Sequence, residues 1–277
     1  MTNSSLLVFR PAVAADHATF LRLFAELAVP DPPPALARFV AVIAPCAFIA
    51  QGANGQVLGY AYHEVLEVDG YVRHVVVDPD ARGMGVGRAI MAELARRFRQ
   101  GGCTHWRLTV KPDNTAARAL YEACGMKPAY AGRVMRVAWS QLASLPAATP
   151  APAGLLASSE LGAFEAALEL PRGLLASLAA RGYLALGVRD ADGTPLGASA
   201  FDPSFPGTFP FRARNLPAAR ALLDASLERR IPIDDAERPW RDVGLQVVVE
   251  DDEALADRLV ANGGIEVLAT VHYTGRL

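Results

Sequence analysis

The sequence predicts an α+β protein of two domains, in each of which helices flank a mixed β-sheet. Three observations support this prediction. The chain has 277 residues, which is more than one ordinary domain needs and too few for three. A stretch rich in proline and alanine, residues 140–154, interrupts it near the middle. On either side of this stretch, apolar periodicity and turn residues predict the same order of strands and helices.

Elements of the first half follow from periodic apolar residues and from the glycines and prolines between them. The spacing of Phe20, Phe24 and Leu27 predicts an amphipathic helix, which the proline-rich residues 30–34 end. Residues 52–55, with the sequence GANG after a glutamine, separate two apolar segments and predict a hairpin. The expected strands cover residues 6–10, 47–51, 56–65, 71–77, 106–110 and about 134–139, and the expected helices cover residues 14–28, 35–43, 86–99 and 114–124.

The second half is expected to repeat this order. Its strands are expected over residues 154–157, 183–189, 196–201, 208–211, 245–249 and from 267, and its helices over residues 161–170, 171–181, 216–229 and 253–262. At an offset of 139 residues, five positions repeat residues of the first half, namely Val249, Asp252, Ala256, Leu259 and Gly264. We therefore expect a first domain at residues 1–145, a linker at 146–153 and a second domain at 154–277.

Composition excludes several classes of protein. Hydrophobic residues make up 52% and charged residues 20% of the chain, which supplies a core and excludes wholesale disorder. No apolar run approaches the length of a membrane span, and the apolar residues 6–9 are too few for a signal peptide. The expected location is therefore the cytoplasm, with no membrane partner.

Charge and cysteine content narrow the function further. Residues 1–145 contain 15 basic and 11 acidic residues, whereas the remainder contains 12 and 18. The small basic excess of the first part is too weak for nucleic acid but suits a pocket for a small polyanion. The three cysteines lie far apart and the five histidines are scattered, so neither a disulfide framework nor a metal site is expected.

A glycine-rich turn between a predicted strand and a predicted helix is the clearest functional motif. Glycines alternate in the sequence Arg82-Gly83-Met84-Gly85-Val86-Gly87-Arg88. Glycine permits positive φ, and successive backbone N–H groups at a helix N-terminus attract phosphate oxygens. The two arginines add positive charge. The alternative interpretation, a turn required only for packing, is less favoured because strand, glycines and arginines occur together.

Other nucleotide and catalytic motifs do not fit the sequence. A dinucleotide-binding fingerprint needs glycine where Arg88 stands, and no Gly-Lys-Ser/Thr of a P-loop is present. His63-Glu64 lacks the second histidine of a zinc peptidase motif. Ser199 lacks the closing glycine of a nucleophile elbow.

The glycine turn resembles the acyl-CoA-binding motif of the GNAT superfamily of N-acetyltransferases, Arg/Gln-x-x-Gly-x-Gly/Ala. This resemblance implies that the turn, including Met84, Val86 and Arg88, holds the pyrophosphate of acetyl-CoA, the expected co-substrate. It further implies that the preceding strand pairs its backbone with the pantetheine arm at Val75 and Val77.

Residues 108–126 resemble a second GNAT signature, Asn-x-x-Ala-x-x-x-Tyr-x-x-x-Gly-Met/Phe. Asn114 and Tyr121 are seven residues apart, about 700° around a helix, so that they share one face with Arg118 between them. The resemblance assigns Tyr121 as the acid that protonates the CoA thiolate, and Asn114 as a polar contact to the cofactor. Because Arg118 shares this face, it is expected to contact the cofactor as well. The alternative interpretations are a packed tyrosine and a helix-capping asparagine.

A general base is harder to assign. An amine is protonated near neutral pH, so direct attack on a thioester needs a base, often through water. Candidates on or beside the two strands before the glycine turn are His63, Glu64, Glu67, Asp69 and His74. Strand alternation predicts that Tyr71, Arg73, Val75 and Val77 share one face and that His74 points away from it. We therefore expect Glu64 or Glu67 as the base, with solvated carboxylates as the alternative.

The second half resembles a degenerate GNAT repeat. At the offset of 139 residues, Glu253 replaces Asn114 and Val260 replaces Tyr121. No glycine occurs between Gly207 and Gly244, so no CoA site is expected there. This half is expected to border the acceptor pocket, to replace the partner subunit of a dimer, or to stabilise the first.

The sequence thus predicts an α+β protein with two GNAT-like domains in tandem. The first is expected to transfer an acetyl group from acetyl-CoA to an amine of a small molecule or peptide by direct attack. Two alternatives stay open: a CoA-binding sensor or scaffold without transferase activity, and a protein-interaction module built on the acidic second half. The acceptor and the oligomeric state are not predicted.

Overall fold

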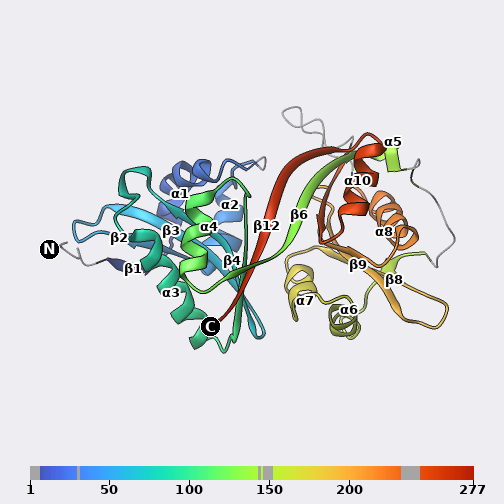
Figure 1. Ribbon diagram of the computed structural model, residues 1–277, viewed down its shortest axis with the longest axis horizontal. Helices are drawn as coiled ribbons and strands as arrows, with labels where there is room; N and C mark the ends of the chain where they lie inside the picture. Colours follow the sequence, from blue (N-terminus) through green and yellow to red (C-terminus); the bar gives the residue numbers. More distant parts are fainter. Residues whose placement is uncertain (1–6, 30–31, 143–144, 146–151, 232–243) are drawn as a thin grey trace. The chain divides into compact units, whose positions relative to one another are not determined.

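The computed structural model describes residues 7–29, 32–142, 145, 152–231 and 244–277. Contacts divide the chain into two compact units, residues 1–129 with 271–277, and residues 130–270 (Figure 1). These limits differ from the expected ones because two long strands, β6 (Lys127–Ala138) and β12 (Ile265–Arg276), each contain a crossing between units. Of the expected linker at 146–153, residues 146–151 lie outside the described residues.

Unit 1 contains one sheet with the strand order β1-β2-β3-β4-β5-β12. Neighbouring strands are antiparallel except for the parallel pair β4–β5. The strands are β1 (Val8–Pro11), β2 (Ala47–Gln51), β3 (Val57–Leu66), β4 (Asp69–Val77), β5 (His105–Val110) and the last part of β12. The helices are α1 (His17–Phe24), α2 (Leu36–Arg38), α3 (Val86–Gln100) and α4 (Thr115–Ala123), and single turns are η1 (Ala14–Asp16), η2 (Ala25–Leu27), η3 (Phe39–Ile43), η4 (Ala44–Cys46) and η5 (Pro79–Ala81).

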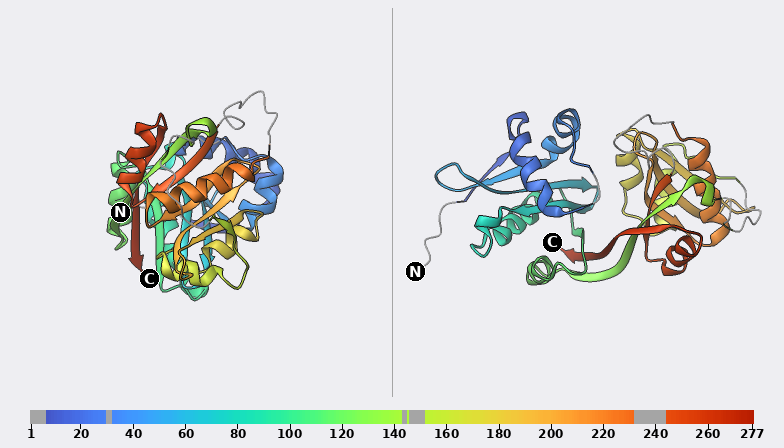
Figure 2. Two further views of the ribbon diagram at one scale, coloured as in Figure 1. Left: turned by 90° about the vertical axis from the view of Figure 1, so that its right-hand side faces the viewer. Right: turned by 90° about the horizontal axis from the view of Figure 1, so that it is seen from above.

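Helices cover both faces of this sheet (Figure 2, right). On one face, α3 buries Ile90, Met91 and Leu94 in a cluster that also contains Tyr121 of α4. On the other face, α1 buries its aromatic residues against β2 and β3, with Tyr60 fully buried. The helix expected over residues 86–99 therefore forms and covers the sheet as its periodicity requires. The segments expected as helices over residues 14–28 and 35–43 instead form the shorter helices α1 and α2 with single turns beside them.

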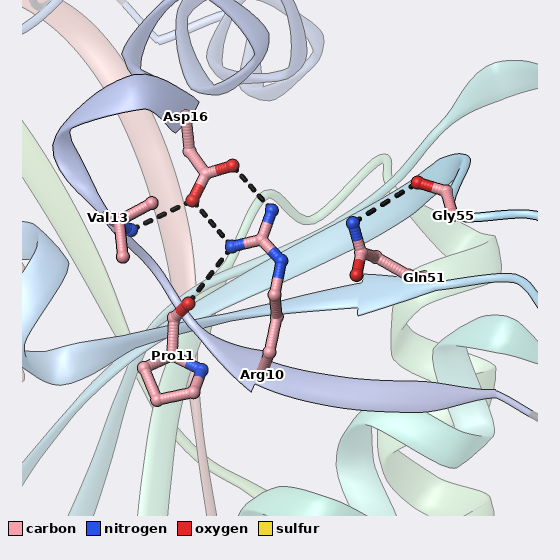
Figure 3. A network of polar contacts seen from close by, with 6 residues as sticks. All are labelled: Arg10, Pro11, Val13, Asp16, Gln51 and Gly55. Carbon is pink, nitrogen blue, oxygen red and sulfur yellow. Dashed lines mark hydrogen bonds and ion pairs between the residues drawn. The ribbon is translucent and has the colours of Figure 1, made fainter.

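The edge of the sheet is held by a local polar network (Figure 3). Asp16 accepts hydrogen bonds from two nitrogens of Arg10, at 2.7 and 2.6 Å, and from the backbone N–H of Val13. Arg10 also donates to the carbonyl of Pro11. These bonds lower the pKa of the Asp16 carboxyl, chiefly through Arg10, and they fix the segment that leads from β1 into η1.

Unit 2 has a sheet of the same kind, in the order β12-β6-β11-β10-β9-β8-β7, in which β10 and β11 are parallel. Helices α8 and α10 pack on one face, and α6 packs on the other, where Gly187 lies against Phe164. Its remaining elements are α5 (Trp139–Leu142), β7 (Gly154–Leu155), α6 (Leu161–Ala167), α7 (Leu174–Ala179), β8 (Leu184–Arg189), β9 (Pro195–Asp202), β10 (Gly207–Ala213), α8 (Leu216–Glu228), β11 (Gly244–Glu250) and α10 (Glu253–Ala261).

The two units repeat each other, but not at one constant offset. Asn114 caps α4 through Ala117 N, and Asp252 caps α10 in the same way through Leu255 N. The caps are 138 residues apart, whereas the preceding strands fit an offset of 139. The loop before α10 is therefore one residue shorter. Cap position matches Asn114 to Asp252 and Tyr121 to Leu259, so the predicted matches to Glu253 and Val260 are wrong.

Among the described helices, none combines the length and the apolarity that a membrane crossing requires.

Candidate functional site

Strands β4 and β5 separate part of the way along their length. Their parallel pairing runs from Asp69 opposite His105 to Val72 opposite Leu108 and then ends. Strand β4 continues to Val77, still paired with β3 on its other side. Beyond Val72, the backbone edge of β4 that faced β5 is therefore not paired with any strand that the structure describes, and its polar groups are available to an extended ligand.

A bulge at Arg73 coincides with this separation. Tyr62 lies opposite His74 but His63 lies opposite Val72, so Arg73 is an extra residue in β4. The bulge changes the alternation that the sequence predicts. Tyr71 and Arg73 lie on the face opposite the cluster of α3, with the Arg73 guanidinium 4.0 Å from the centre of the Tyr71 ring.

Val75 and Val77 lie on the α3 face, as expected, whereas Tyr71 and Arg73 do not share it. His74 points away from the valines and contacts Phe24, Tyr60 and Tyr62 on the α1 face. The expected common face of all four residues is therefore wrong, because the bulge reverses the alternation between Val72 and Val75.

The glycine turn after β4 has the geometry of an anion cradle. Gly83 and Gly85 have φ of 77° and 83°, and a Cβ on either would meet no atom within 4 Å. Five backbone N–H groups of the turn have no acceptor among the described residues. They belong to Gly83 and to the four consecutive residues Gly85, Val86, Gly87 and Arg88. Three of these groups open the 15-residue helix α3, whose N-terminus carries partial positive charge.

Gly87 serves a different purpose from the other two glycines. It lies in the first turn of α3 and does not have a positive φ. A Cβ there would lie 3.1 Å from Leu120 of α4 and 3.6 Å from Val77 of β4. Gly87 therefore permits the close approach of α3 to α4, and only two glycines of the motif need positive φ.

Arginines flank the turn as expected, but only one of them forms an ion pair among the described residues. Arg82 donates to Glu26 of η2 at 2.6 Å, and both side chains are well exposed. No ion pair of Arg88 is found in the described part of the chain, and this side chain is exposed. Asp78, which begins the turn, is paired with Arg22 at 2.7 Å, and this bond lowers the pKa of its carboxyl.

Helix α4 presents the second set of predicted residues. Tyr121 is buried, with 7% of its surface exposed, and lies in the same cluster as Val75 and Val77. Burial, with a contribution from Cys124, raises the pKa of its hydroxyl to about 12. Among the described residues, its hydroxyl has no hydrogen-bond partner, so its proton is free to be donated to a ligand.

Asn114 and Arg118 already have structural partners. Asn114 accepts a hydrogen bond from Ala117 N at 3.1 Å as the N-cap of α4. Arg118 donates to the carbonyl of Pro112 at 2.9 Å and to the hydroxyl of Tyr273 at 3.1 Å. Both therefore shape the start of the helix, whatever further contact a cofactor makes.

The two predicted bases lie in different places. Glu64 is buried and accepts hydrogen bonds from Tyr62 at 2.9 Å and from Arg73 at 3.0 Å. It is thus attached to the residue at which β4 and β5 separate. Glu67 is exposed in the β3–β4 turn, at φ 47°. It is six residues from Arg73 along the chain, about 20 Å on an extended strand, so the structure does not bring it to the separation.

The remaining base candidates have structural surroundings. Asp69 forms an ion pair with Arg107 of β5 at 2.8 Å. Burial, reinforced by nearby arginines, lowers the pKa values of His63 and His74 to about 4. His63 lies between Phe48 and Phe98, and His74 bonds the Tyr60 hydroxyl at 3.2 Å. Both histidines are neutral near pH 7 and pack within the sheet layers.

Segment Val271–Leu277 belongs to unit 1, whereas the sequence predicts it to be part of the second domain. It pairs with β5 along the whole strand, from Val271 opposite Val110 to Arg276 opposite His105. Tyr273 is fully buried beside Tyr121, with ring centres 6.1 Å apart. Apolar alternation predicts a strand here but not its partner, which is remote in sequence. No cluster that could hold a metal ion is found in the described ranges.

The corresponding region of unit 2 is closed. Strands β10 and β11 stay paired as far as Phe211 opposite Val249, near the end of β10. Between Gly193 and Asp251, no described residue has a positive φ. Asn215 caps α8, and Pro217, in its first turn, has no N–H to offer.

Comparison with known proteins shows a match to one family model and similarity to several relatives. Residues 19–126 match the model of the acetyltransferase (GNAT) family. A mycothiol acetyltransferase of Saccharomonospora viridis is 35% identical over 89 residues, which span 29% of this chain and 29% of that protein. A [ribosomal protein bS18]-alanine N-acetyltransferase of Escherichia coli is 33% identical over 76 residues, 27% of this chain and 51% of that protein. The chain thus spans about half or less of these relatives' lengths.

A likeness over the full length comes from solved structures. A tandem GNAT protein from the clavulanic acid biosynthesis pathway has a TM-score of 0.59 at 20% identity, covering 98% of both chains. At this identity the likeness concerns the fold, and it extends to both units.

Proposed function

Residues 19–126 match the acetyltransferase (GNAT) family model, and on this premise we propose that unit 1 transfers an acetyl group from acetyl-CoA to a primary amine. One observation carries the proposal: the unpaired edge of β4 leads directly into a turn in which five backbone N–H groups have no acceptor among the described residues. An extended chain ending in a pyrophosphate matches this pair of features.

Binding of acetyl-CoA involves chiefly the backbone. The N–H groups of residues 83 and 85–88 hold the pyrophosphate, and Arg88 adds charge. Backbone groups of β4 around Val75 and Val77 pair with the pantetheine amides. The bound thioester supplies an acyl group that is activated toward nucleophiles.

Transfer then requires two proton movements. The amine nitrogen forms a bond to the acyl carbon while the carbon–sulfur bond breaks, and the amine loses a proton. We assign that proton to Glu64, through water, because its carboxylate is held at the point where β4 and β5 separate. Tyr121 donates its proton to the leaving thiolate and regains one from solvent. The pKa of the Tyr121 hydroxyl, about 12, keeps this group protonated until the carbon–sulfur bond breaks and the thiolate forms.

The acceptor is a primary amine of unassigned scaffold. One relative named above is a mycothiol acetyltransferase, and the other acetylates an alanine of a ribosomal protein, as their names state. The similarity to both supports either a small molecule or a protein as the amine acceptor. Unit 2 is proposed to bind no CoA, because its strand pair is closed and its turn lacks the cradle.

An amine panel tests the proposal. The protein is incubated with acetyl-CoA and with amino sugars, amino acids, aminoglycosides, polyamines or peptides with free N-termini, and released CoA thiol is measured. We expect acceptor-dependent thiol release with at least one class of amine. The Tyr121→Phe variant should show only a small residual rate of release with the same amine. Tight CoA binding without thiol release for any amine would instead favour a CoA sensor or scaffold.

A further inference from the structure

A single buried side chain joins segment Val271–Leu277 to the helix that carries Tyr121. The hydroxyl of Tyr273 donates to Glu122 Oε1 at 2.8 Å and accepts a hydrogen bond from Arg118 Nε at 3.1 Å. Its ring meets that of Tyr121 edge to face, at 61° between planes. Tyr273 therefore contacts three residues of α4, two through its hydroxyl and one through its ring.

These contacts restrict the helix in two ways. Residues 118, 121 and 122 lie on adjacent turns of one side of α4, so contacts to all three oppose rotation about the helix axis. Arg118 also donates to the Pro112 carbonyl, which ties the same network to the loop before the helix. Sliding of this nine-residue helix along its axis would break these bonds.

The strand that carries Tyr273 is itself firmly placed. Gly275 lies so close to Trp106 that a Cβ would be 2.7 Å from its indole nitrogen. The N–H of Leu277 donates to the Thr104 carbonyl at 3.0 Å. Tyr273 is thus held in a fixed position in the sheet, and its contacts determine the position of α4.

We propose that Tyr273 is a positioning residue for acetyl transfer: its hydroxyl, through Arg118 and Glu122, sets the position from which Tyr121 protonates the thiolate. This inference rests on the proposed role of Tyr121 and extends it to a residue more than 150 positions away. Proton donation needs the hydroxyl within hydrogen-bond reach of the sulfur, and a shift of about 1 Å costs up to about 10²-fold in rate.

Tyr273→Phe tests the proposal because it removes the hydroxyl and keeps the ring. We expect kcat to fall about 10- to 100-fold while the KM for acetyl-CoA and the calorimetric CoA affinity stay within about twofold. Asp16→Asn is the matched control: it weakens a polar network of unit 1 at the β1 edge, away from α4, and should lower thermal stability without lowering kcat. Glu122→Gln removes the charge of the acceptor but keeps an oxygen that can accept the Tyr273 hydrogen bond, so it should lower kcat by less than Tyr273→Phe does.

A second readout does not depend on the acceptor. In protein labelled with ¹³C-tyrosine, the Tyr121 ring signal is assigned by its loss in Tyr121→Phe, and it should shift and broaden in Tyr273→Phe but not in Asp16→Asn. A wild-type kcat or an unmoved Tyr121 signal in Tyr273→Phe would overturn the proposal. If the wild-type protein acetylated no amine, the proposed function would fail, while the ring signal would still decide whether Tyr273 positions Tyr121.

Discussion

Val72 and Leu108 form the last parallel pair between β4 and β5, and the extra residue of the β4 bulge, Arg73, follows directly. The position at which the strands separate is therefore the position at which β4 changes its alternation. Arg73 directs its side chain to Glu64 at this point, while Val75 and Val77 continue toward the glycine turn. The unpaired edge of β4 and the glycine turn thus follow one another along the chain, and Glu64 of the neighbouring strand β3 lies where this edge begins.

Gly85→Val should abolish measurable CoA binding. Valine is strained at φ 83°, and its side chain would fill the open space in front of the free N–H groups. Gly55→Val is the control, because Gly55 has φ 79° and equally open surroundings but lies in the β2–β3 hairpin. Isothermal titration with CoA should separate the two variants, and equal affinities would show that the turn is not the cradle.

Tyr121→Phe should keep CoA affinity and lower kcat by roughly 10²- to 10⁴-fold, as expected for loss of a general acid. The raised pKa, about 12, also predicts that Tyr121 stays protonated throughout pH 6–10. Deprotonation of Tyr121 should therefore cause no alkaline decline of kcat in that range. Steady-state rates across pH test this, and a decline that vanishes in Tyr121→Phe would contradict the assignment.

Glu64→Gln and Glu67→Gln form a matched pair on one hairpin. We expect the first to lower kcat by about 10²-fold or more, since it removes the proposed base, and the second to have little effect, since Glu67 is exposed in the turn. The comparison uses initial rates with the best acceptor found. If Glu67→Gln were the inactive variant, the assignment of the base to Glu64 would be wrong.

Acid should destabilise the protein through its buried histidines. The pKa values of His63 and His74 fall to about 4 in the folded protein, against an ordinary value of about 6.5, so the unfolded chain binds their protons first. Their contribution to stability is complete above about pH 6.5 and is lost as the pH falls toward 4, by at most about 3 kcal/mol for each. Urea unfolding at pH 7 and pH 5 should show a smaller loss for His74→Phe than for wild type.

Calorimetry should give one CoA per chain. In unit 2, Leu259 stands where Tyr121 stands in unit 1, and Pro217 removes one N–H from the start of α8. Gly85→Val should therefore remove all binding rather than half of it. A second binding event that survives in this variant would show that unit 2 holds CoA after all.

Local motifs accounted for most of what the sequence predicted. The α+β class and the tandem arrangement are confirmed, because turn glycines, caps and apolar periodicity act over a few residues. The glycine turn lies between strand and helix as expected. Gly83 and Gly85 have positive φ there, a conformation that glycine adopts more easily than other residues.

Features that depend on distant residues were not predictable in this way. The bulge at Arg73 has no local signal, and it reversed the predicted face of Tyr71. Tyr273 lies 151 residues from Glu122, and no pattern in either segment indicates the other. The expected register of the repeat is wrong by one residue at the helix, because the loop before α10 is shorter and shifts the helix but not the preceding strand.

The route of the chain has a consequence for its biosynthesis. Strand β5 cannot pair with its neighbour, residues 271–277, until all of unit 2 has been translated. On the ribosome, the nascent first unit therefore carries an unpaired strand edge, a template for wrong pairing between chains. The helix of Tyr121 likewise lacks its partner Tyr273 during this interval. If unit 1 has the proposed function, acetyl transfer should therefore begin only after residues 271–277 have been translated. A nonsense mutation in unit 2 should then abolish activity at the proposed site in unit 1.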